Sequence, residues 1–117
     1  MDTLTIVQET QQTYYEYINQ VEKGCLQISE YLRTEQISEA LNTIIQFSEG
    51  IVWLLQVEEL MNKNGFSMDS LIHKANEFLN EINQALEIRD YVFVADLFEY
   101  ELNPLFKEQA LKRFSEI

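Results

Sequence analysis

The sequence predicts an all-α fold, an antiparallel up-down-up-down four-helix bundle made by a single domain over residues 1–117. Apolar residues recur at steps of three and four over long stretches, which is the pattern of helices with one buried face. Three Gly and one Pro in 117 residues are too few for a loop-rich β-sandwich or barrel. Short connections between long helices make successive helices antiparallel. Charges that suit the helix dipole mark the predicted starts (Asp2, Glu35, Asp69, Asp90) and ends (Arg33, Lys63, Arg89, Lys112 and Arg113).

The first predicted helix covers residues 3–33. Its steps of three and four continue without interruption, which indicates one long helix with a heptad seam. Gly24 lies within it and costs about 1 kcal/mol relative to Ala. The seam consists of Leu4, Val7, Gln11, Tyr14, Ile18, Val21, Cys25, Ile28 and Leu32.

The second predicted helix covers residues 35–63, with Thr34 as its cap. Two adjacent apolar stripes give it a wide buried face. The Asn64-Gly65 pair is a stop signal that ends it near Lys63. The stripes contain Ile37, Ala40, Leu41, Ile44, Phe47, Ile51, Leu54, Leu55 and Met61.

The third predicted helix covers residues 68–88, and the fourth covers residues 91–114. Ser67 is the expected N-cap of the third helix, between Phe66 and Leu71 at the hydrophobic-staple positions. Asp90 is the expected cap of the fourth. Pro104 removes one backbone donor, so this helix either kinks or breaks and restarts; the continuing apolar face favours the kink.

Composition excludes several classes of function. Twenty acidic and eight basic residues give a net charge of −12, which repels nucleic acid and anionic membranes. The longest apolar run, residues 51–55, is too short to cross a bilayer. The N-terminus lacks the basic and apolar regions of a signal peptide, so we expect a cytoplasmic protein.

Unequal helix lengths predict a partner-binding surface. The first two helices are about 30 residues long and the third about 21, so the turn around Thr34 should overhang by about 10–15 Å. The apolar residues of this tip would bind another protein or a second copy, forming a homodimer; alternatively, the first helix bends and the tip covers itself. Tyr15 and Tyr17 are further interface candidates. The expected partner-binding set is Cys25, Ile28, Leu32, Ile37, Leu41, Tyr15 and Tyr17.

Candidate chemistry is sparse. Asp69, His73 and Glu77 follow one helical line that suits a metal or a solvated face, and we expect the latter. Cys25 is expected to be a buried structural thiol. We therefore expect no catalytic residues, metal or cofactor, and a non-enzymatic protein. The alternative is an enzyme or small-ligand binder with a carboxylate in the core, for which Glu58 is the best candidate, followed by Glu49 and Glu101.

The stretch DYVFVADLFEYELNPL, residues 90–105, resembles a signature of small α-helical proteins of Gram-positive bacteria. The resemblance covers about one helix of four. It implies an all-helical bacterial cytosolic protein and carries over no catalytic residue. Asp96, Glu99, Tyr100 and Glu101 lie on this helix as a solvated face or an acidic docking face. Together these observations favour a protein–protein interaction module of the adaptor, chaperone or inhibitor type, because strong acidity speeds encounter with a basic partner.

Overall fold

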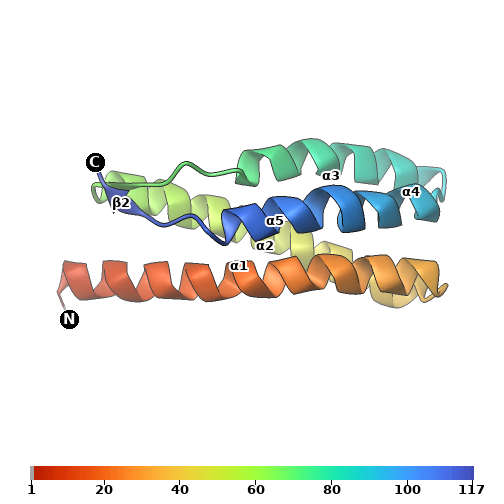
Figure 1. The fold of residues 1–117 in the computed structure, drawn as a ribbon, viewed down its shortest axis with the longest axis horizontal. Coiled ribbons are helices and arrows are strands. Elements are labelled where there is room, and N and C mark those ends of the chain that lie inside the picture. Colours follow the sequence, from red (N-terminus) through yellow and green to blue (C-terminus); the bar gives the residue numbers. More distant parts are fainter. Residues whose placement is uncertain (1) are drawn as a thin grey trace.

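The computed structural model describes residues 2–117, and the all-α prediction is confirmed. The helices lie along the axis of a rod that measures 48 × 22 × 21 Å (Figure 1). Both termini lie at one end of this rod, as Figure 1 shows. The core is a continuous set of apolar side chains from every helix, and its largest fully buried members include Tyr14, Phe98, Phe106, Ile18 and Ile28.

Helix α1 spans Thr3–Arg33, as predicted, and α2 spans Ile37–Lys63. An Asp2 carboxylate oxygen accepts a hydrogen bond from the Thr5 backbone N–H at 2.8 Å and caps α1. The start of α2 lies two residues later than predicted. Thr34 does not cap α2, because its hydroxyl donates to the Glu30 carbonyl and closes α1 instead. Glu35 then adopts a φ of 61°, which places it outside either helix.

The predicted stop after α2 is confirmed, since the helix ends at Lys63 and Gly65 has a φ of +88°. Helix α3 spans Ile72–Glu87 and starts later than the predicted residue 68. Ser67 does not cap it, because Phe66–Ser67 forms the short strand β1. The Ser70 hydroxyl accepts from the Ile72 N–H, and the Gln109 side chain accepts from the Leu71 N–H, so the helix begins there.

The fourth helix has three parts: α4 (Tyr91–Asp96), the π-helical segment η1 (Leu97–Leu102) and α5 (Asn103–Gln109). Asp90 caps it as predicted, by accepting from the Phe93 N–H at 3.2 Å. The helix continues through Pro104 because the turn before it widens: the Asn103 N–H donates to the Phe98 carbonyl, five residues back. Because this turn has a different hydrogen-bond pattern, the helix tolerates a proline that has no backbone N–H to donate.

The fourth helix ends at Gln109, five residues before the predicted end. The following tail is extended, and β2 (Ser115–Glu116) pairs antiparallel with β1, aligning Phe66 with Glu116 and Ser67 with Ser115. Phe114 makes apolar contacts as predicted, but from the extended tail rather than from a helix: its ring packs against Tyr14 and Tyr15 of α1. Within residues 2–117, every helix is too short or too polar to pass through a membrane.

Candidate functional site

The predicted overhang of the Thr34 turn is wrong, because the α1–α2 and α3–α4 turns lie level with each other. Residues of both turns line one groove of about 510 Å³, with Leu32, Glu35 and Ile37 on one side and Asp90 and Tyr91 on the other. Helices α3 and α4–α5 are shorter than α1 and α2, but the unmatched length falls at the opposite end of the rod. There the β1 segment and the C-terminal tail supply the cover.

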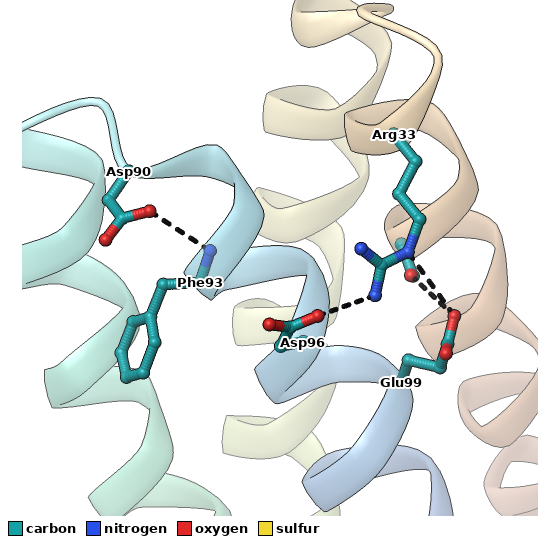
Figure 2. Close-up of polar contacts among 6 residues, drawn as sticks. Arg33, Asp90, Phe93, Asp96 and Glu99 are labelled. Carbon is teal, nitrogen blue, oxygen red and sulfur yellow. Dashed lines mark hydrogen bonds and ion pairs between the residues drawn. The ribbon is translucent and has the colours of Figure 1, made fainter.

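An ion-pair cluster fastens the two turns together. Arg33 of α1 donates to Asp96 at 2.8 Å, and its Nε lies 3.5 Å from a Glu99 carboxylate oxygen. Ser29 also donates to Glu99, at 3.2 Å. Figure 2 shows the guanidinium of Arg33 between these two carboxylates, with the Asp90 cap at the start of α4 drawn separately from it. Contact with the Tyr100 hydroxyl, and then with Ser29 and Arg33, lowers the pKa of the Glu99 carboxyl.

This cluster divides the acidic face that the sequence suggested on the fourth helix. Asp96 and Glu99 face α1 and are engaged by Arg33. Tyr100 and Glu101 face solvent. The four residues therefore do not form one docking face.

Burial removes three of the predicted partner-binding residues from the surface. Cys25, Ile28 and Leu32 are buried in the core, so the expectation that they lack cover is wrong. Ile37 is half-buried, and Leu41 is 37% exposed. Burial also raises the pKa of the Cys25 thiol, which fits a structural cysteine rather than a nucleophile.

The two tyrosine candidates are half-buried and pack within the molecule. The Tyr15 hydroxyl accepts from the Phe114 N–H at 3.0 Å, and the Arg113 guanidinium lies 4.5 Å from the centre of its ring. Tyr17 meets Trp53 edge to face, with 5.3 Å between ring centroids. Its ring also lies against Gly50 of α2, where a Cβ would collide with it.

The main polar cluster of the interior centres on Tyr14, which the sequence placed only in the seam. The Tyr14 hydroxyl donates to Glu58 at 2.7 Å and accepts from the Gln109 amide at 3.0 Å. The Gln109 oxygen accepts from the Leu71 N–H at 2.8 Å, and its amide nitrogen lies 3.1 Å from the Met68 sulfur. Burial and then the Glu58 carboxylate raise the pKa of Tyr14 above its ordinary value.

This cluster joins α1, α2, the segment before α3 and the end of α5. Sequence reasoning found Glu58 as an interior carboxylate but missed Gln109, whose only signal was its place one turn after Phe106 on the buried face. Glu58 is half-buried and holds Tyr14. Glu49 and Glu101 are exposed, so the structure does not bring the three carboxylates together.

Asp69, His73 and Glu77 are all exposed, as expected for a solvated face. Asp69 lies 3.7 Å from the Lys112 ammonium group. Among residues 2–117 no three His, Cys, Asp or Glu side chains are grouped so that they could hold a metal ion.

An exposed apolar cluster, which the sequence did not predict, lies at the α3–α4 turn. Ile88 is 76% exposed, Val92 is 69% exposed and Phe93 is 40% exposed. Ile88 and Phe93 line a groove of about 400 Å³ with Ala85, Glu81 and Asp90. The signal for this cluster was Ile88 itself, an apolar residue beside the charged Arg89-Asp90 turn that belongs to neither neighbouring stripe.

The family model described as "Domain of unknown function (DUF8042)" matches residues 9–111. The chain belongs to this family. The matched span contains the Tyr14–Glu58–Gln109 cluster and the α3–α4 turn, and it ends before β2. No curated protein and no solved structure matches the chain.

Proposed function

We propose that this DUF8042 chain is a non-enzymatic protein–protein interaction module that binds its partner at the α3–α4 turn. The carrying observation is the exposure of three large apolar side chains around this turn: Ile88 and Phe93 line one groove, and Val92 lines the neighbouring groove on the α1 side. A cluster of exposed large apolar side chains is typical of interaction sites, whereas single ones are normal on any surface. An adaptor, a chaperone and an inhibitor all fit this proposal.

The scaffold supports the proposal by holding this surface in place. The Arg33 cluster fixes the turn to α1, and the Asp90 cap fixes the first turn of α4. A surface that is already rigid loses less conformational entropy on binding. The proposal includes an up-down-up-down antiparallel four-helix bundle as scaffold, a cytoplasmic location, and an origin among the small helical proteins of Gram-positive bacteria.

The interior polar groups favour binding over catalysis. The Tyr14 hydroxyl, the Glu58 carboxylate and the Gln109 amide bond one another and the backbone of Leu71. Groups engaged in this way hold helices together and have little capacity left for a substrate. Exposed large apolar side chains also occur elsewhere, such as Ile45 and Val52 of α2, whereas those at the α3–α4 turn line two neighbouring grooves.

Site-specific photocrosslinking in the native host tests the proposal. A photoreactive phenylalanine analogue replaces Val92 in one strain and His73, exposed at the other end of α3, in another. We expect a discrete adduct with one protein at position 92 and none at position 73. Equal labelling at both positions, or no adduct at position 92, would contradict the proposal, and an adduct with a second copy would identify a homodimer.

The folding of the surface variants is checked separately. Val92→Asp and Ile88→Asp should each change the free energy of unfolding by no more than about 0.5 kcal/mol, because both side chains are largely exposed. They should nevertheless abolish the adduct from a crosslinker at Phe93. A loss of adduct accompanied by unfolding would not support a binding surface.

A further inference from the structure

A second groove continues the first along the line where α3 meets the fourth helix. The first groove, at the turn, contains Ile88 and Phe93. The second, of about 260 Å³, contains Phe78 of α3 with Tyr100 and Leu105 of the fourth helix. The residues that α3 and its two ends contribute to the grooves, at positions 71, 74, 78, 81, 84, 85 and 88, recur mostly at steps of three and four and so share one helix face. We call this line of two grooves the α3 seam.

The π turn determines which residues of the fourth helix reach the α3 seam. In a regular α-helix, Glu101, Leu105 and Glu108 would lie about 60–120° away from Phe93 around the axis. The wider turn of η1 shifts the following residues back by about one position, or roughly 100°. Glu101, Leu105 and Glu108 therefore line the α3 seam with Tyr100.

The seam combines apolar side chains with an excess of negative charge. Its carboxylates are Glu81 and Asp90 in the first groove and Glu101 and Glu108 in the second, against one cation, Lys74. Arg89, the other nearby cation, lines the neighbouring groove on the α1 side of the turn. The chain as a whole carries a net charge of −12, so the field at the seam is reinforced by its surroundings.

We infer that the α3 seam binds a positively charged amphipathic segment of another protein, with its apolar side chains in the two grooves and its lysines or arginines beside the four carboxylates. This inference rests on the proposed function and adds the chemistry of the partner. Charge complementarity decides between occupants: a second copy would bring twelve further negative charges to an acidic surface. The seam runs most of the length of α3, about 24 Å, which matches a segment of about four helical turns.

The test measures the binding of defined peptides to the full chain. The probe is a fluorescently labelled lysine–leucine peptide about four turns long with leucines on one face; the comparison peptide carries glutamine in place of every lysine. Binding is followed by fluorescence anisotropy at low and physiological salt, and the contact surface by amide chemical shifts. We expect the lysine peptide to bind more tightly, to weaken with salt, and to shift amides of α3 and α4.

Two matched pairs of variants locate the binding site. Glu81→Lys, in the seam, is compared with Glu16→Lys, which makes the same change of charge at an exposed position of α1. Ile88→Ser is compared with Val52→Ser, at an exposed apolar position of α2. We expect each seam variant to weaken peptide binding about fivefold more than its control.

Four results would overturn the inference: no binding of the lysine peptide, equal binding of the glutamine peptide, equal losses in a seam variant and its control, or shifts centred on another face. Failure here is distinguishable from failure of the proposed function. A photocrosslink from position 93, in the first groove, to a neutral or acidic segment would refute the basic partner while leaving the interaction module intact. A lysine peptide bound at the seam without any adduct at position 92 or 93 in the host would remove the proposed function instead.

Discussion

Replacing Gln109 with leucine tests whether the Tyr14 cluster holds the start of α3 and the end of α5 together. Leucine has nearly the same volume but neither the carbonyl oxygen nor the NH2 group of the amide. The variant loses the donation to Tyr14, the contact with Met68 and the acceptor for the Leu71 N–H, all of which lie in a buried or part-buried environment. A lost neutral hydrogen bond costs about 0.5–1.5 kcal/mol, and an unsatisfied buried N–H costs about 1–3 kcal/mol.

The burial of leucine in place of an amide returns about 1 kcal/mol of this loss. We therefore expect Gln109→Leu to lower the free energy of unfolding by about 2 kcal/mol, or Tm by roughly 6–10 °C. Chemical denaturation and calorimetry measure both quantities, and hydrogen exchange should show faster exchange at the Leu71 amide. Gln27→Leu, at an exposed position of α1, is the matched control and should change stability by no more than about 0.5 kcal/mol.

A double-mutant cycle makes the test specific to the hydrogen bond. Tyr14→Phe removes the partner hydroxyl, so the Gln109→Leu and Tyr14→Phe losses should be non-additive by about 1 kcal/mol. If Gln109→Leu costs no more than Gln27→Leu, or if the two losses in the cycle simply add, the amide does not hold the cluster and our account of the α3 start is wrong.

Further predictions concern single contacts. Gly24→Ala should stabilise the chain by about 0.5–1 kcal/mol, since nothing lies near the added methyl group, whereas Gly50→Ala must displace Tyr17 and should be less stable than Gly24→Ala by at least about 1 kcal/mol in urea unfolding. Phe114→Ala should lower stability by about 2 kcal/mol by removing the ring from its two tyrosine partners; a loss below about 0.5 kcal/mol would mean that the tail does not cover α1. Stability should fall above about pH 10, by up to about 1.4 kcal/mol per pH unit, because the unfolded chain ionises Tyr14 at its ordinary pKa while the folded chain retains the proton; Tyr14→Phe should reduce this slope in denaturation at pH 9 to 11, and an unchanged slope would contradict the raised pKa.

The helices were predictable because their signals are local. Steps of three and four gave the extent of α1 to the residue, and the Asn64-Gly65 stop and the Asp90 cap are confirmed. These features depend on side chains within one or two turns of each other. The all-α class follows from them without any long-range contact.

The boundaries that failed depend on contacts between distant parts of the chain. The start of α3 is fixed by Gln109, 38 residues away from the Leu71 N–H that it accepts from. The early end of α5 follows from pairing between Ser67 and Ser115, and from the packing of Phe114 on α1. No local pattern distinguishes Phe114 on a helix face from the same ring at the end of an extended tail.

The failure of the predicted overhang has a geometric origin. Unequal helix lengths are visible in the sequence, but they do not say at which end of the rod the excess falls. Helix α3 begins only at Ile72, so the excess length of α1 and α2 falls at the end where the tail and β1 cover it, and the Arg33–Asp96 pair bridges α1 and α4 at the other end. With the two turns level, Leu32 is buried, whereas Val92 on the other turn is 69% exposed. The level of the two turns thus depends on the late start of α3, which Gln109 fixes from 38 residues away, so periodicity along either helix could not reveal it.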